Sequence, residues 1–317
     1  MSVRDRFRRD CRGGVPIQTT GLFVIVLVIG LTTAGVLFGL GTAFTGPTPV
    51  TVDSGQCIQT LTFDPQEIDG FADEQTASDQ YAEGMFPCVL WLDASGTGEF
   101  DDGEPVTEWT DRSTNLLSAH PTGEEPRWMT VDGVPAARFN GSESGGLSVA
   151  LDADNRTLDA ESGLTVTMLV YVENRTDRGG LYGISDGRDD STDGDSSAVD
   201  LRQSAVAAER SQAADWWATP GHQSEITTEG QWAIITHTVD TGSGELFVNG
   251  DSQGEVDDGV DELGSEIWIG TTPSGQTFDG YVAEFYLTDE RFSTGQRTLV
   301  ECAIDAKHDS VVDLDAC

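Results

Sequence analysis

The stretch from Trp232 to Gly250 reads WAIITHTVDTGSGELFVNG and alternates between strand and turn signals. Trp232–Val239 mixes β-branched and apolar residues in a long run, as the central strand of a sheet does. A second strand is predicted at Glu245–Val248. The sequence that follows it, Val248-Asn249-Gly250-Asp251, is typical of a type I′ hairpin, since Asn-Gly readily adopts positive φ at both central positions. The stretch therefore predicts two strands and a tight hairpin.

Similar strand signals recur on both sides of this stretch. Leu164–Val172 is a second long alternating run, which predicts another central strand. Shorter strands are expected at Val89–Asp93, Ala136–Asn140, Leu147–Val149, Gly180–Ile184, Ala198–Leu201, Glu266–Ile269 and Phe278–Leu287. One helix is expected, at Ser293–Lys307, with Ser293 as its N-cap. Many strands punctuated by turns, with one short helix, predict an all-β antiparallel sandwich.

Several short motifs follow one another in a characteristic order. They are LWLDA at 90–94, VTEWTDRS at 106–113, PAARFNG at 135–141, WAIIT at 232–236, GELFVNG at 244–250, IWIG at 267–270 and FDGYVAE at 278–284. In this order the chain resembles the LamG-like, concanavalin A-like jelly-roll family over residues 88–307. The resemblance implies a two-sheet jelly roll in which these residues serve the fold, with Glu284 facing a polar partner or the outer side of a sheet. It implies little about activity, because that family includes lectin-like modules, adhesins and a few hydrolases.

The charge of the chain is extreme. Its 317 residues include 17 Lys and Arg against 55 Asp and Glu, a formal net charge of −38, and Lys307 is the only lysine. A nucleic-acid binder is excluded, because phosphate contacts need a basic face. Such a surface repels itself in dilute buffer, whereas at molar salt the Debye length falls to about 3 Å. The composition therefore predicts a protein of a halophile, similar to haloarchaeal proteins, whose acidic residues are mostly solvated.

The N-terminal region predicts a membrane helix. No charged residue occurs between Arg12 and Asp53, and Gly21–Phe44 is almost wholly apolar. These residues would form a helix roughly 36 Å long, enough to cross a bilayer with some tilt. The Arg-rich residues 1–12 place the N-terminus in the cytoplasm by the positive-inside rule. We therefore expect a leader at 1–12, a single transmembrane helix at 13–44, an extracellular stalk at 45–87, the jelly-roll domain at 88–307 and a tail at 308–317.

The same region also resembles the class III signal of archaeal type IV prepilins. Arg12-Gly13-Gly14 stands directly before the uncharged helix, which implies cleavage near Gly13 and Gly14 and packing of the helix into a filament. Two features depart from that pattern: Pro16 lies in the first turn, and Gln18 replaces the Glu of many bacterial pilins. A plain signal anchor and a self-assembling pilin-like subunit therefore both stay open. An archaeal virus surface protein is a third alternative.

Cysteine and asparagine usage agrees with an extracellular domain. Four cysteines follow the apolar helix, at Cys57, Cys88, Cys302 and Cys317, and an even number suits disulfides in an oxidising space. Three connectivities exist, of which Cys57–Cys88 with Cys302–Cys317 is the most local. Asn140, Asn155 and Asn174 each open an Asn-x-Ser/Thr sequon, which predicts N-glycosylation.

Two segments are candidate ligand sites. The densest acidic cluster consists of Asp186, Asp189, Asp190, Asp193 and Asp195. It is a candidate calcium site, but its spacing does not match an EF-hand, and a solvated hairpin loop of a halophilic protein is the favoured interpretation. The pair Trp216-Trp217 is the second candidate. Adjacent residues on a strand point to opposite faces, so one of the two rings is available to stack on a sugar unless both cover the core.

Catalysis is not expected. Residues 99–104, EFDDGE, have the E-x-D-x-x-E form and so resemble a signature of β-glucanases with this fold, which needs two carboxylates on one face of a strand. Here Asp101-Asp102-Gly103 is typical of a turn. The sequence predicts a non-enzymatic surface protein that binds a carbohydrate or a protein in adhesion. A glycoside hydrolase on the same fold is the alternative.

The charge leads to a test in salt. Far-UV circular dichroism should show loss of β structure as KCl falls from molar concentration to about 0.1 M, where the Debye length reaches about 10 Å. The reason is that the uncompensated carboxylates then repel one another. Unchanged stability over that range would contradict the halophilic interpretation.

Overall fold

The computed structural model describes residues 50–51, 55–58 and most of 85–317. Within the last range it leaves out 99, 142–144, 152–155, 159–161, 174–178, 186–195, 203–204, 212–222, 225–229, 242, 257–264, 273–276 and 313. The chain divides into two compact units, Met1–Thr48 and Pro49–Cys317, and all described residues belong to the second. The predicted leader, the Gly13-Gly14 signal and the predicted membrane helix lie outside them. Among the described residues, no helix is long and apolar enough to span a bilayer.

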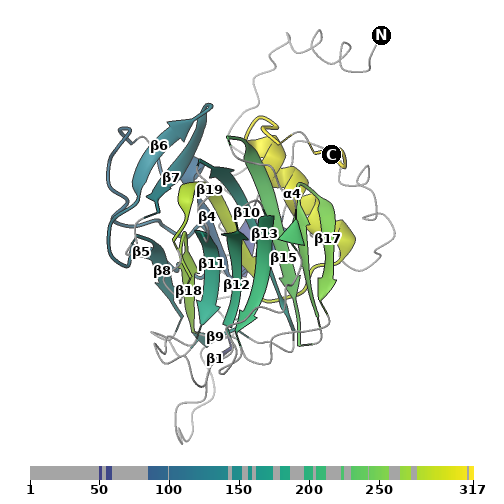
Figure 1. Cartoon of the computed structure of the whole chain (residues 1–317). Helices are drawn as coiled ribbons and strands as arrows, with labels where there is room; N and C mark the ends of the chain where they lie inside the picture. Colours follow the sequence, from purple (N-terminus) through teal and green to yellow (C-terminus); the bar gives the residue numbers. More distant parts are fainter. Residues whose placement is uncertain are drawn as a thin grey trace, which may run out of the picture. The chain divides into compact units, whose positions relative to one another are not determined.

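The second unit contains two antiparallel sheets, which confirms the predicted β-sandwich (Figure 1). One sheet has the order β17-β16-β15-β10-β19-β7-β6, with β4 also paired to β19, and the other has the order β14-β13-β12-β11-β18-β8-β5. The first comprises β4 (Leu90–Asp93), β6 (Arg127–Val131), β7 (Val134–Asn140), β10 (Leu164–Val172), β15 (Trp232–Val239), β16 (Gly244–Val248), β17 (Asp251–Val256) and β19 (Asp279–Thr288). The second comprises β5 (His120–Pro121), β8 (Leu147–Ala150), β11 (Gly179–Ser185), β12 (Ser196–Arg202), β13 (Ala205–Ser211), β14 (Gln223–Ser224) and β18 (Glu266–Ile269).

The predicted strands are present, and three of them, β10, β15 and β18, begin and end at the predicted residues. Asn249 and Gly250 have φ of 50° and 83°, which confirms the hairpin between β16 and β17. Three longer strands, β6, β13 and β17, were not among the predicted strands, although the Asn-Gly hairpin implies a partner strand after β16, which is β17. For β6 the signal was in the sequence, since Asp132-Gly133 forms the same kind of turn, with φ of 52° and 86°. β13 is rich in alanine, a weak strand former, and is a strand because it pairs along its length with β12.

β10 lies between β15 and β19 and is buried along almost its whole length. Val166, Met168 and Val170 pack into the core between the two sheets. Leu169 points the opposite way, into a second apolar cluster on the outer face of the first sheet. This sheet is therefore covered on both faces, and its central strands read as continuous apolar runs.

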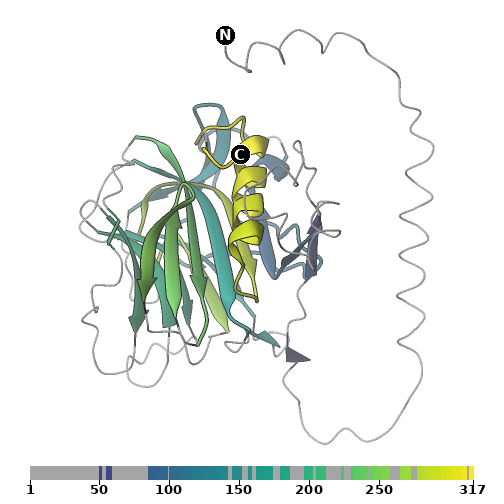
Figure 2. The same cartoon turned by 90° about the vertical axis from the view of Figure 1, so that its right-hand side faces the viewer.

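Helix α4 (Thr294–Lys307) covers that outer face and confirms the predicted helix (Figure 2). Ser293 caps it through a capping box: Ser293 Oγ accepts from Gln296 N, and Ser293 N donates to Gln296 Oε1 at 2.9 Å. Leu299, Val300 and Ile304 bury the apolar stripe of the helix against the sheet. The helix thus completes a second core outside the sandwich.

The residues after the helix are folded back onto it. Cys302 and Cys317 form a disulfide, with a Cα–Cα distance of 5.5 Å. Asp305 Oδ1 accepts from the backbone N–H of Val312 at 2.9 Å, which holds the tail in place. Cys88 is also disulfide-bonded, and pairing of Cys57 with Cys88 stays the prediction for that bond.

The segment expected to be a stalk contains short strands. β1 (Val50–Thr51) pairs in parallel with β9 (Arg156–Thr157), and β2 (Gly55–Ile58) pairs with β3 (Met85–Cys88). The Tyr286 hydroxyl of β19 donates to the carbonyl of Pro87. The end of this segment is therefore attached to the first sheet.

Replacing Trp232 tests the second core. Its side chain is 6% exposed and packs edge-on against Tyr171 in the outer-face cluster, so Trp232→Ala should lower the free energy of unfolding by about 3–5 kcal/mol. Chemical denaturation in molar KCl measures this. Thr130→Ala, at an exposed position of β6, is the control and should change it by less than about 0.5 kcal/mol. Equal stability of the two variants would contradict the assignment.

Candidate functional site

Two features bring functional side chains together, a buried cluster under the end of α4 and a surface pocket beside β7. The first, here called the lysine cluster, consists of Asp93, Glu284, Lys307 and His308. Asp93 ends β4 directly opposite Glu284 of β19, and the side chains of both are 0% exposed. Lys307 is the last residue of α4 and His308 is its C-cap. The cluster therefore joins two strands to the helix end.

A bulge in β19 gives Glu284 its direction. The register against β10 shifts between Leu169, which pairs with Glu284, and Val170, which pairs with Val282. Val282 and Phe285 both face the core between the sheets, so Glu284 lies on the outer face. In a regular strand it would share the face of Val282 and enter the apolar core. The bulge thus avoids a buried charge without partners.

The hydrogen-bonding partners of Glu284 are polar groups on the outer face of the sheet, as the resemblance to the jelly-roll family implied. Its Oε1 accepts from Trp91 Nε1 at 2.7 Å and from Lys307 Nζ at 2.5 Å, and its Oε2 lies 3.0 Å from His308 Nε2. Lys307 Nζ also lies 3.3 Å from Asp93 Oδ2. The ammonium group therefore sits between two buried carboxylates.

The surroundings of Asp93 favour its charged form. Burial by itself raises the pKa of this carboxyl, but Lys307, the Ser95 hydrogen bond, Arg112 and His308 together lower it below the ordinary value. Arg112 Nη1 lies 2.5 Å from Asp93 Oδ2 and its guanidinium stacks 4.9 Å from the Trp91 ring. Asp93 is thus held as a carboxylate.

Asp93, Glu284 and His308 also have the residue types and spacing of a metal site. In the part of the chain that the structure describes, they form the one group of three such side chains whose ligand atoms lie within 4.8 Å of one another. An ion there would have to displace Lys307, which already bonds both carboxylates. The residues therefore fit a built-in ammonium better than a metal, and their role is to attach α4 to β4 and β19.

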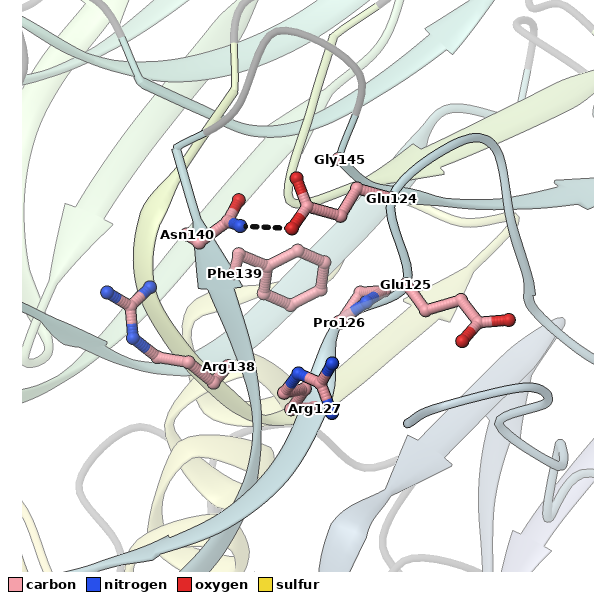
Figure 3. A pocket seen from close by; sticks show the side chains of 8 residues that line it. All are labelled: Glu124, Glu125, Pro126, Arg127, Arg138, Phe139, Asn140 and Gly145. Atoms are coloured by element: carbon pink, nitrogen blue, oxygen red, sulfur yellow. Dashed lines mark hydrogen bonds between the residues drawn. The ribbon is translucent and has the colours of Figure 1, made fainter. Parts of the chain in front are cut away.

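The second feature is a small pocket of about 50 Å³ between the start of β6 and the end of β7 (Figure 3). Its lining residues are Glu124, Glu125, Pro126, Arg127, Arg138, Phe139, Asn140 and Gly145. The Phe139 ring, 3% exposed, lies at its centre beside Pro126. Asn140 Nδ2 donates to Glu124 Oε1 at 2.9 Å at the rim. The pocket therefore has an apolar floor and a polar rim.

Two arginines near this pocket stand directly opposite each other on β6 and β7. Arg127 pairs in register with Arg138, an arrangement in which like charges repel. Arg138 is neutralised by Asp279 at 2.7 Å and Glu173 at 2.5 Å and lies 5.0 Å from the Tyr281 ring centre. Arg127 is exposed and donates to the carbonyl of Gly103 at 2.6 Å. The charge of Arg138 is thus compensated by two carboxylates, whereas the charge of Arg127 lies at the surface, close to the exposed Glu124 and Glu125.

Such a pocket suits a ligand with hydroxyl groups and an apolar ring face. An exposed carboxylate accepts and a guanidinium donates, while the largely buried Phe139 and Pro126 form the floor. Sugars have both properties. The pocket was not predicted from the sequence, because its residues come from three separate segments, one of which runs into a strand that was missed.

The candidate residues named from the sequence divide into two groups. Asn140 ends β7 and is exposed, and Asp101, Asp102 and Glu104 are exposed around a turn at Gly103 with φ of 91°. The others lie outside the described residues: Glu99, Trp216, Trp217, Asp186, Asp189, Asp190, Asp193, Asp195, Asn155 and Asn174. Their roles stay predictions. The sequence analysis did not predict the lysine cluster. A usable signal was present, because Lys307 is the one lysine in a chain whose other cations are arginines.

Comparison with known proteins agrees with this architecture. Residues 143–296 match the concanavalin A-like lectin/glucanases superfamily. That segment is therefore a domain of this superfamily. A search of curated proteins by sequence finds no match.

Solved structures with the same fold include two complexes of Trypanosoma rangeli sialidase. The complex with 2,3-difluoro-KDN has a TM-score of 0.50 and 13% identity over 74% of this chain and 36% of that one. The complex with the inhibitor DANA has a TM-score of 0.50 and 12% identity over 75% and 36%. The botulinum neurotoxin serotype D binding domain is also similar, with a TM-score of 0.44 and 11% identity over 68% and 51%. The chain spans about a third of the sialidase chains, and this likeness concerns the fold alone.

Removing the ammonium group tests the lysine cluster. Lys307→Met leaves two carboxylates buried without their shared cation, so the free energy of unfolding should fall by about 3–5 kcal/mol at neutral pH. The lowered pKa of Asp93 adds stability above its unfolded pKa, and this is lost as pH falls through the folded value. Because the variant loses one cause of the lowering, its acid loss should begin at higher pH.

Denaturation at a series of pH values measures both effects. Arg127→Met removes an exposed cation and is the matched control, expected to cost less than about 0.5 kcal/mol. A Lys307→Met variant as stable as this control would show that the cluster does not hold the helix.

Proposed function

We propose that this chain is a non-catalytic binding module displayed outside the membrane of a halophile, and that its ligand is a carbohydrate. The observation that carries the proposal is the pocket around Phe139, with Glu124 and Arg127 exposed at its rim. Its chemistry matches a sugar, which offers hydroxyl groups and a C–H face at once. The superfamily of residues 143–296, which includes lectins by its description, supports the same ligand class.

The burial of the acidic pair supports binding over hydrolysis. Most retaining and inverting glycosidases need two carboxyl groups that flank the scissile glycosidic bond. Asp93 and Glu284 lie opposite each other in register, but both are sealed under α4 and bonded to Lys307. A substrate could not reach them without undocking the helix.

An extracellular location is supported by the disulfide between Cys302 and Cys317, because disulfides persist in oxidising compartments. The Arg-rich N-terminus before the apolar stretch orients the domain outward. We propose a single-pass membrane protein whose N-terminus is cytoplasmic, with adhesion as its role. A filament built on the same helix is the alternative arrangement.

A glycan array tests the ligand class. The full-length chain, produced without N-glycosylation and kept in detergent and molar KCl, should bind a subset of glycans, and Glu124→Gln or Arg127→Ala should weaken binding about tenfold, the loss of roughly 1.4 kcal/mol. Thr130→Ala, exposed on the same strand as Arg127, should bind as the wild type does. Binding that both pocket variants retain would exclude the pocket. Release of a smaller sugar during the assay would show a hydrolase.

Replacing Gly13 by a bulky residue tests how the helix is used. A signal anchor keeps Arg4 to Arg12 and should show unchanged mass and location, because its topology depends on charge alone. A prepilin should accumulate at higher mass and fail to assemble, since its peptidase needs a small residue at the cut. Intact-mass measurement of membrane fractions separates them, and a mature N-terminus within Gly13–Val15 would overturn the anchor.

A further inference from the structure

We propose that Asn140 carries an N-linked glycan whose first sugar packs over the pocket around Phe139, so that glycosylation closes this pocket to other ligands. The inference rests on the proposed function in one respect, because it needs the domain to lie outside the membrane. The inference goes beyond the proposed function, because it names the group that occupies the pocket and the modification that controls access to the pocket.

The acceptor atom lies at the mouth of the pocket. Asn140 is the last residue of β7, is exposed, and opens the sequon Asn140-Gly141-Ser142. Gly141 has φ of 68°, a left-handed backbone conformation that favours glycine. Asn140 Nδ2, where a glycan attaches, is 2.9 Å from Glu124 Oε1, and Figure 3 shows the two side chains meeting beside Phe139. A sugar bonded to this nitrogen must begin next to Glu124.

The glycan would be transferred to Asn140 from a single donor, an oligosaccharide linked to a lipid phosphate. The bond between the sugar C1 and the phosphate oxygen breaks, and a bond between C1 and Asn140 Nδ2 forms. The amide loses one proton and the lipid phosphate leaves. Nδ2 keeps one N–H, so the glycosylated amide retains a donor for Glu124.

The lining of the pocket fits a sugar held there. Glu124 and Arg127 are exposed and offer an acceptor and donors to its hydroxyl groups. Pro126 and the Phe139 ring are buried and provide the apolar floor. A pocket of about 50 Å³ cannot hold an attached sugar and a free ligand together. Occupancy of Asn140 would therefore decide whether the binding module is available.

Mass spectrometry of the full chain from a halophilic, glycosylating host tests the attachment. Cleavage after Arg138 and Glu143 releases the peptide FNGSE, which separates Asn140 from Asn155. Its mass should be raised by a glycan in the wild type and in Ser142→Thr, which keeps the sequon. Ser142→Ala, which removes the sequon and replaces none of the eight lining residues named above, should give the bare peptide. A bare peptide from the wild type would overturn the proposal.

Hydrogen exchange tests the packing. If the first sugar covers the pocket, backbone amides at Glu124, Glu125 and Arg127 should exchange several-fold faster in Ser142→Ala than in the wild type and Ser142→Thr. Equal rates in a protein glycosylated at Asn140 would overturn the packing, because the glycan then projects into solvent.

The glycan array, repeated with the Ser142→Ala variant, tests this inference separately from the proposed function. If both hold, Ser142→Ala should bind its glycans more strongly than the glycosylated wild type. An array silent for every variant would overturn the binding role, while the mass and exchange results would still decide the glycan. Equal binding by wild type and Ser142→Ala would overturn the closing of the pocket.

Discussion

The eight-stranded sheet is buried on both faces, and polar groups on its outer face therefore need partners inside the protein. The second sheet covers one face, and α4 with the tail covers the other. At one end of the helix, the lysine cluster supplies these partners, because Lys307 bonds the buried carboxylates of Asp93 and Glu284. At the other end Thr165 Oγ1 accepts from Phe292 N at 2.9 Å and donates to Glu290 O at 2.9 Å, just before the cap. Both ends of α4 are thus attached through polar contacts that an apolar stripe alone would not supply.

A second buried ion pair lies along the helix. Arg297 and Glu301 are 2.5 Å apart, with their side chains 7% and 1% exposed. Burial raises the pKa of Glu301, opposed by the Arg297 charge and a hydrogen bond from Thr236. The Arg297 guanidinium lies 3.8 Å from the Phe247 ring centre, so it also serves as a packing group. Such pairs add little net stability but penalise any other placement of the helix, which suits a role in orientation.

Charged groups on the surface, unlike the buried ones, are mostly not paired with an opposite charge. With a formal net charge of −38, most carboxylates repel one another and depend on salt. The pocket is an exception, because Arg127 stands beside Glu124 and Glu125. Lys307 is the opposite case, since the one lysine of the chain is placed where a compact cation with three donors bonds two buried carboxylates. In these two places, the few cations of the chain therefore lie beside specific carboxylates.

The sequence by itself determined the elements that depend on local rules. The alternating runs of Leu164–Val172 and Trp232–Val239, the Asn249-Gly250 turn and the Ser293 cap each need only near neighbours, and the structure has them at the predicted residues. Tertiary structure alone decided the lysine cluster and the pocket. Glu284 reaches Trp91 across 193 residues because a bulge turns it outward, and Glu124 meets Asn140 because β6 pairs with β7 in one register. A shift of one residue would send each side chain to the opposite face, and periodicity does not specify where a bulge falls.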